Sequence, residues 1–340
     1  MSFSYKRVYR GPIEAVLLDW AGTTMDFGCM APAVVFVEVF RRKKVPITIE
    51  EARAPMGAHK RVHIQRISEL DSVRQRWQET HGRPPNDDDV SAMFAEFVPL
   101  QLECLSTYSA LIPGTLEAVA ELRRRGIKIG STTGYLTEMM KINQADAKRQ
   151  GYEPDATVCA ADVPAGRPYP YMCLQNVIKL GVSTVHACVK IDDTVPGVEE
   201  GLNAGMWTIG LAVSGNEVGM MLDEWRALPA AQQNAKRARA TARMQQCGAH
   251  YTVDSIADIM PCIDEIQVRI RRGETPRAAR ETAPRSRLMQ TLLSILSGIA
   301  LLVWGTHIVR SGVLRVFGGN LRKVLADSVA NRFHAFLAGL

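Results

Sequence analysis

The feature that most constrains the fold is a repeated unit of helix, glycine and strand that begins near residue 113. Amphipathic stretches over 115–125, 136–150 and 169–180 each end at a glycine, at positions 126, 151 and 181, and a short apolar stretch follows each one. Glycine is common just after a helix, because it adopts the left-handed conformation without a steric penalty. Alternation of helix and strand at this spacing predicts an α/β fold with a doubly wound parallel sheet.

The strands of this sheet are predicted from short apolar runs. The first run covers 13–18 and ends at Asp19. Further strands are expected over 127–131, 157–160, 185–191, 208–213 and 249–253, with helices over 195–204, 224–248 and 256–270. Functional groups of such sheets gather at the carboxyl ends of the strands. We therefore expect a site around Asp19, Thr132–Thr133 and Asp192–Asp193.

One long section interrupts the alternation. Residues 32–106 show helical periodicity and no convincing strand, as in the apolar pattern of Val34, Val35, Phe36, Val39 and Phe40. The predicted organisation is a core of residues 10–28 and 107–268, a helical cap over 29–106, a basic linker over 269–287 and a hydrophobic segment over 288–340.

The C-terminal part differs in composition. Residues 271–287 hold six arginines and account for much of the net charge of +6, so the charge does not indicate nucleic-acid binding. Residues 288–309 carry no charge over 22 positions, which is about the length that a bilayer core needs. This favours a membrane helix, with a buried helix of a soluble domain as the alternative. The run from Gly298 to Arg322 also resembles the opening of bacterial sodium-dependent phosphate cotransporters.

The cysteines point to the compartment. Seven are present, an odd number, and none forms a CxxC pair. This pattern is typical of a reducing environment. We expect a cytoplasmic catalytic domain, with a tether to the inner membrane through 288–309 as an open question.

The residues around Asp19 suit phosphate chemistry. Asp19 is followed by Gly22, Thr23 and Thr24, whose backbone N–H groups and hydroxyls can contact an anion. Thr133 could hold a phosphoryl oxygen, Arg167 supplies a fixed positive charge, and Asp193 can complete an oxygen site for Mg²⁺ with Asp19. The order of these four residues resembles the haloacid dehalogenase superfamily. Most phosphatases of that superfamily carry a second acid two residues after the first Asp, where this chain has Ala21.

Longer motifs resemble the phosphonoacetaldehyde hydrolase (phosphonatase) family over about residues 10–268. They are Asp-Trp-Ala-Gly-Thr-Thr-Met-Asp-Phe-Gly-Cys, Glu-Ala-Arg-Ala-Pro-Met-Gly-Ala-His-Lys, Gly-Ser-Thr-Thr-Gly-Tyr, Pro-Ala-Gly-Arg-Pro-Tyr-Pro and Asn-Ala-Gly-Met-Trp. The resemblance implies cleavage of phosphonoacetaldehyde to acetaldehyde and phosphate in 2-aminoethylphosphonate degradation, and a homodimer. It implies that Asp19 is the nucleophile, that Lys60 forms a Schiff base, and that Mg²⁺ is held by Asp19, the Ala21 carbonyl and Asp193. The implied substrate-binding residues are Thr133, Gly134, Arg167, Tyr135, Met56, Cys29 and His63.

The chemistry is consistent with Ala21. A carbon–phosphorus bond breaks with difficulty because the departing carbon would be a carbanion, and an iminium on Lys60 would accept those electrons. No oxygen then needs a proton from an acid at position 21. Lysine has a pKa near 10.4, so we expect its surroundings to lower that value. A phosphate-ester phosphatase and a membrane-tethered protein that only binds phosphorylated ligands are the alternatives.

The sequence leaves the roles of three further residues open. His63 could shuttle protons, or it could be a solvated histidine on a helix. Cys29 is expected to pack near Lys60 rather than to act as a second nucleophile. Gly197 stands where many superfamily members have another acid, so water or Asp192 could take that role.

Overall fold

The computed structural model describes residues 8–276, and its centre is a six-stranded parallel sheet. The strands are β1 (Ala15–Leu18), β2 (Lys128–Thr133), β3 (Ala156–Cys159), β4 (Cys188–Asp192), β5 (Trp207–Leu211) and β6 (Tyr251–Val253). Their order is β3-β2-β1-β4-β5-β6, and each neighbouring pair is parallel. The chain moves outward from β1 to β3 and then returns to β4 on the other side of β1. The predicted parallel sheet is confirmed, and its strand order reverses between β1 and β4, where α/β folds place their ligands.

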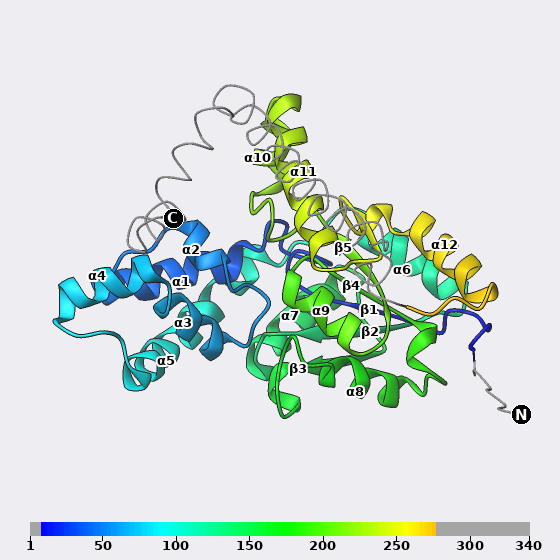
Figure 1. The fold of residues 1–340 in the computed structure, drawn as a ribbon, viewed down its shortest axis with the longest axis horizontal. Coiled ribbons are helices and arrows are strands. Elements are labelled where there is room, and N and C mark those ends of the chain that lie inside the picture. Colours follow the sequence, from blue (N-terminus) through cyan, green and yellow to red (C-terminus); the bar gives the residue numbers. More distant parts are fainter. Residues whose placement is uncertain (1–7, 277–340) are drawn as a thin grey trace, which may run out of the picture. The chain divides into compact units, whose positions relative to one another are not determined.

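Side chains of β1 alternate between two hydrophobic cores. Val16 and Leu18 pack in the larger core with α6 (Thr115–Arg124), α7 (Thr137–Arg149) and α12 (Met260–Arg271). Ala15 and Leu17 pack in a second core with α8 (Tyr171–Leu180). Figure 1 shows α12 and α8 on opposite sides of the strands. Every residue of β1 is buried, as expected for a parallel strand that helices cover on both faces.

Five of the helices between β1 and β2 form a helical body, the cap, with its own apolar interior (Figure 1). They are α1 (Met30–Arg42), α2 (Ile49–Arg53), α3 (Lys60–Ser68), α4 (Asp71–His81) and α5 (Asp87–Cys104). The Phe36 ring of α1 stacks on Phe97 of α5 at a centroid distance of 4.5 Å, and Trp77 of α4 packs edge-on against Phe40. These rings are fully or nearly fully buried, so aromatic contacts between helices far apart in the chain hold the cap together.

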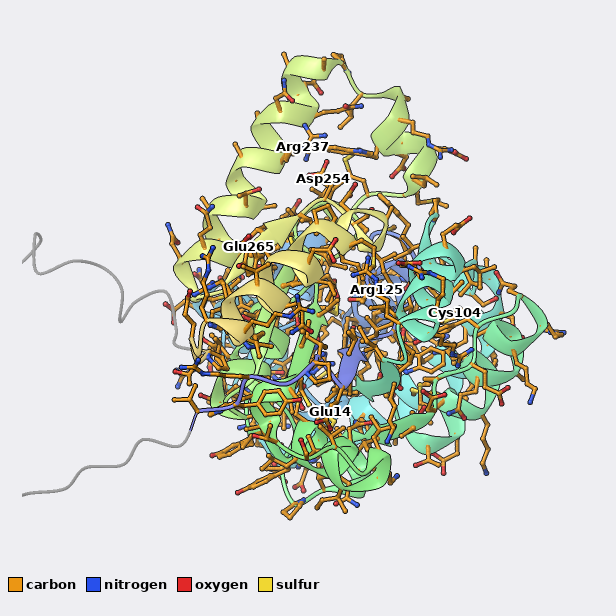
Figure 2. All side chains as sticks on the ribbon, turned by 90° about the vertical axis from the view of Figure 1, so that its right-hand side faces the viewer. Glu14, Cys104, Arg125, Arg237, Asp254 and Glu265 are labelled. Carbon is orange, nitrogen blue, oxygen red and sulfur yellow. The ribbon has the colours of Figure 1, made fainter. Side chains whose placement is uncertain are left out.

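Several element boundaries differ from the sequence expectation. The strand predicted from residue 185 begins only at Cys188, because Val185–Ala187 form a 3₁₀ turn that the Thr184 hydroxyl caps. The helices predicted over 224–248 are α10 (Leu222–Ala227), which begins two residues earlier than expected, and α11 (Ala230–Gln246), with Pro229 between them. Proline favours an extended conformation in the residue before it, which ends a helix there. Arg237 of α11 forms an ion pair of 2.8 Å with Asp254, just after β6 (Figure 2).

The last described helix extends into the predicted linker. α12 ends at Arg271, so residues 269–271 are helical rather than linker. The predicted membrane helix over 288–309 and the transporter-like segment over 288–340 lie outside the described residues and stay predictions. Between residues 8 and 276, no helix has the length and apolarity that crossing a bilayer requires.

Candidate active site

Acidic side chains from neighbouring strand ends meet at one edge of the sheet. Asp19 follows β1, while Asp192 ends β4 and Asp193 follows it. β1 and β4 pair in parallel with Leu18 opposite Ile191, so these residues reach the same level. One carboxylate oxygen from each of the three lies within 4.8 Å of the others. The three aspartates are buried, which makes this a compact acidic cluster inside the protein.

The loop after Asp19 is packed tightly on this cluster. Thr24 Oγ1 donates a hydrogen bond of 3.1 Å to the Asp19 carbonyl, and Thr23 Oγ1 donates one of 3.2 Å to Asp193 Oδ1. Gly22 has a φ of 82°, and a Cβ there would lie 2.3 Å from Asp193 Oδ2. Only glycine fits this position, because both the backbone conformation and the space exclude a side chain.

Arg167 is a buried cation that contacts the cluster. Its Nη2 donates to Asp19 Oδ1 at 2.6 Å and to Thr132 Oγ1 at 2.9 Å, and its Nε donates to Glu200 Oε2 at 3.1 Å. Burial opposes its charge, but Asp19, Asp192 and Glu200 raise the pKa of Arg167 well above its ordinary value. The guanidinium is therefore a permanent charge that fixes the orientation of the Asp19 carboxylate.

Both carboxylate oxygens of Asp192 contact protein donors. Oδ1 accepts the Thr194 N–H at 3.0 Å and its hydroxyl at 2.7 Å, and Oδ2 pairs with Lys190 at 2.6 Å and with Arg167 at 3.1 Å. Burial opposes its charge, but these two cations hold the pKa of Asp192 below its usual range. A Cβ on Gly197 would lie 2.0 Å from Asp192 Cγ. The Asp192 carboxylate thus fills the space that an acid at position 197 would need.

The remaining charge fits a divalent cation. Four buried carboxylates, Asp19, Asp192, Asp193 and Glu200, face two buried cations, Arg167 and Lys190, and leave two negative charges uncompensated. Burial is the largest cause that raises the pKa of Asp19, and it raises the pKa of Asp193 well above the ordinary value. The neighbouring acids act in the same direction. Hard oxygen donors in a buried anionic site are what Mg²⁺ prefers. Asp19 and Asp193 would hold the ion, and the Ala21 carbonyl, which accepts the Cys29 thiol at 3.2 Å, lies beside them.

The cap contributes Lys60 to the same site. Lys60 begins α3, is 5 % exposed, and places Nζ 4.6 Å from the Tyr135 ring centroid and 5.8 Å from that of Phe36. Burial lowers the pKa of Lys60 to about 8. Because the two rings give the ammonium only weak compensation, the expected lowering of the lysine pKa agrees with its surroundings.

A small cavity joins these groups. Six of the seven predicted substrate residues line it together with Asp19, Ala21 and Lys60. The six are Thr133, Gly134, Arg167, Tyr135, Met56 and Cys29. The structure thus gathers most of the predicted residues around one space.

His63 is the predicted residue that the structure does not place at the cavity wall. It is fully buried, Nε2 lies 2.7 Å from the Ala52 carbonyl, and the ring stacks on Phe36 at 3.8 Å. The alternative of a solvated histidine is therefore wrong. Burial lowers the pKa of His63 well below its usual value, so a neutral ring joins α3 to α2 inside the cap.

Sequence reasoning missed several residues that hold the site. Glu200 anchors Arg167 beside the predicted strand-end residue Thr132, and Lys190 neutralises Asp192. Asp26 accepts the backbone N–H groups of Met30 and Ala31 at the start of α1, and burial raises the pKa of Asp26 to about 7. An acid just before a helix is a recognisable capping signal. Glu200 and Lys190 gave no such signal, since only burial distinguishes them from surface charges.

Comparisons with known proteins agree with this geometry. A sequence model described as haloacid dehalogenase-like hydrolase matches residues 13–205. The phosphonoacetaldehyde hydrolase of Hahella chejuensis is 48 % identical over 276 residues, which cover 81 % of this chain and 94 % of that protein. The Vibrio cholerae protein of the same name is 47 % identical, over 78 % of this chain and 98 % of its own length. The crystal structure of a phosphonoacetaldehyde hydrolase-like protein from Oleispira antarctica matches with a TM-score of 0.79 and 42 % identity, covering 81 % of this chain and 100 % of that one.

Proposed function

Because the chain belongs to the haloacid dehalogenase-like hydrolases and, within them, to the phosphonoacetaldehyde hydrolases, we propose that it hydrolyses phosphonoacetaldehyde to acetaldehyde and phosphate. The observation that carries this proposal is that Lys60 and Asp19 line the same cavity. One is a buried amine whose pKa is lowered to about 8, and the other is a carboxylate oriented by Arg167. An amine nucleophile and a carboxylate nucleophile in one small site suit a substrate with an aldehyde and a phosphonate.

In the first step, the neutral Lys60 amine attacks the aldehyde carbon, water leaves, and one proton taken up from solvent gives a protonated imine. The lowered pKa supports this step, because a larger share of the amine is uncharged near neutral pH. The Tyr135 and Phe36 rings limit the positions of the amine.

In the second step, Asp19 attacks phosphorus and the electrons of the carbon–phosphorus bond move into the iminium. The products are an aspartyl phosphate and a neutral enamine on Lys60. Arg167 holds one Asp19 oxygen and thereby orients the carboxylate for the attack. Ala21 has no acidic side chain, and none is needed because no oxygen leaves. When bound, Mg²⁺ would neutralise the charge of the phosphonate and the surrounding carboxylates.

In the last step, water hydrolyses the aspartyl phosphate and releases phosphate. The enamine takes up a proton at carbon, and hydrolysis of the resulting imine releases acetaldehyde and restores Lys60. One water is consumed overall, as hydrolysis requires. We also propose a place in 2-aminoethylphosphonate degradation, a homodimer and a cytoplasmic catalytic domain, which rest on the family resemblance and the cysteine pattern.

The ester phosphatase alternative fits less well. A departing alkoxide needs a proton donor, and position 21 offers none, while a buried lysine at the cavity would have no task. A phosphatase would also not require Lys60 for its chemistry.

The test is phosphate release from phosphonoacetaldehyde by the full chain, with and without Mg²⁺. We expect Mg²⁺-dependent release and, with borohydride, a covalent adduct on Lys60. Lys60→Arg should lose both, because a guanidinium does not form an imine, whereas Lys148→Arg on the surface should keep both. No release by the folded chain, or an active Lys60→Arg variant, contradicts the proposal.

A further inference from the structure

The cap is joined to the core by few polar contacts. Segments 26–29 and 105–112 connect the cap to the core. In the described residues, every hydrogen bond between cap residues 31–104 and the core outside these two segments involves Arg53. Arg53 is the last residue of α2 and is 8 % exposed. Arginine is rarely buried unless it is paired, and the partners of Arg53 explain its burial.

Arg53 connects three segments of the chain. Its Nη1 donates to the Gly28 carbonyl, in the connecting segment, at 2.6 Å and lies 3.4 Å from Asn216 Oδ1. In return, Asn216 Nδ2 donates to the Arg53 carbonyl at 3.3 Å. The guanidinium lies on the backbone of Gly219, where a Cβ would be 2.8 Å from Arg53 Cζ. The loop 214–219, between β5 and α10, is thus shaped to receive this side chain.

The same loop lies directly on the acidic cluster. The Asn216 N–H donates to Asp193 Oδ2 at 2.8 Å, and Ser214 Oγ donates to the Gly22 carbonyl at 2.8 Å. A Cβ on Gly215 would lie 2.1 Å from Asp193 Cβ. Asn216 therefore contacts the cap with its side chain and Asp193 with its backbone.

We propose that Arg53 is a positioning residue that latches the cap onto loop 214–219 and thereby places Lys60 opposite Asp19. The inference rests on the proposed function, since Lys60 belongs to the cap and Asp19 to the core. It assigns to Arg53 no contact with the substrate. Its role is to favour the docked arrangement in which the two nucleophiles line one cavity.

Loss of the latch has a distinctive kinetic result. If the docked cap is less populated, substrate binding must supply the missing free energy, so the apparent affinity falls by the populated fraction. At saturating substrate the docked form is largely restored. We therefore expect KM to rise about 10-fold or more and kcat to change by less than about 3-fold, given the strength of a hydrogen bond from a charged donor. Partial misfolding would instead lower kcat and leave KM unchanged.

The experiment compares the wild-type chain with its Arg53→Met variant, and Arg61→Met is the matched control. Arg61 also lies in the cap, one residue from Lys60, but its ion pair with Asp87 stays within the cap. A second readout needs neither substrate nor metal: the rate at which N-ethylmaleimide modifies Cys29, which is 3 % exposed and lines the cavity. Peptide mass spectrometry should show faster modification of Cys29 in Arg53→Met, with Cys173 of α8 unchanged as an internal reference.

Asn216→Ala provides an independent variant, because it removes the side-chain contact and keeps the N–H that Asp193 accepts. It should raise KM and the Cys29 rate in the same direction, and the double variant should be no worse than the stronger single one, as for two residues of one interaction. If Arg53→Met does not fold, Asn216→Ala decides alone. Wild-type KM and Cys29 reactivity in folded Asn216→Ala would overturn the latch. If the wild type releases no phosphate, the proposed function fails, while the Cys29 rates still decide the latch.

Discussion

Lys60 Nζ lies 4.6 Å from the centroid of the Tyr135 ring, so the amine of the cap rests on an aromatic face of the core. Tyr135 follows β2 directly after Thr133 and Gly134, which line the same cavity. The contact joins the two parts of the proposed mechanism, imine formation on the cap and phosphoryl transfer on the core. The protonation state of Lys60, and its effect on the free energy of unfolding, therefore report on the whole site.

The first prediction concerns pH. Because burial lowers the pKa of Lys60 to about 8, and the neutral amine is the reactive form, kcat/KM should rise with pH and level off above about 9. The neutral fraction is about one tenth at pH 7 and about nine tenths at pH 9. A kcat/KM profile from pH 6.5 to 9.5 in excess Mg²⁺ measures this limb. A midpoint near 10, as for an exposed lysine, contradicts it.

The second prediction concerns stability. The pKa of Lys60 falls from 10.5 to about 8 on folding, so protonated Lys60 opposes folding. This penalty is complete below pH 8 and is lost as pH rises from 8 to 10.5. Lys60→Met should raise the free energy of unfolding by up to about 3 kcal/mol at pH 7. Urea unfolding at pH 7 and pH 9.5 checks it, and the gain should shrink at the higher pH. A less stable Lys60→Met variant at pH 7 would count against a buried, unpaired amine.

The third prediction concerns the Tyr135 ring. An aromatic face stabilises the protonated lysine, so Tyr135→Leu should shift the rising limb of kcat/KM to lower pH, by up to about one pH unit. Tyr135→Phe keeps the face and serves as the control, with a smaller shift. A shift to higher pH in Tyr135→Leu would mean that the ring does not stabilise the cation.

The fourth prediction concerns the space shared by Asp192 and Gly197. A Cβ on Gly197 would lie 2.0 Å from Asp192 Cγ, so Gly197→Ala should destabilise the fold by about 2 kcal/mol or more, as crowding in a packed interior does. It should also lower activity, because Asp192 contacts Arg167. In Asp192→Gly the space is free, so adding Gly197→Asp to that variant should cost less stability than Gly197→Asp alone. Thermal unfolding of the wild type, Asp192→Gly, Gly197→Asp and the double variant tests this. If Gly197→Asp costs the same stability with Asp192 present and absent, the two positions do not compete for space.

Much of the framework followed from local patterns. Helix–glycine–strand units predicted the parallel sheet, and in such a sheet the ends of adjacent strands must lie side by side, which places Asp19, Thr133 and Asp193 near one another. Errors arose where a local contact replaced the expected element, as at the 3₁₀ turn before Cys188. The roles assigned to Asp19 and Lys60 rest on motifs and stay predictions until they are measured.

The sequence by itself determined the class of sheet, the helical insertion and the strand-end acids, because periodicity and glycine positions act over a few residues. The tertiary structure decided the rest. In the folded chain, His63 is buried in the cap, Glu200 anchors Arg167, and Lys60 lies on the Tyr135 ring. These contacts depend on how helices and loops pack, since Arg53 and Asn216 are 163 residues apart in the chain. A charged residue has the same local pattern on a surface as in a buried site, and only packing determines whether it is solvated or paired.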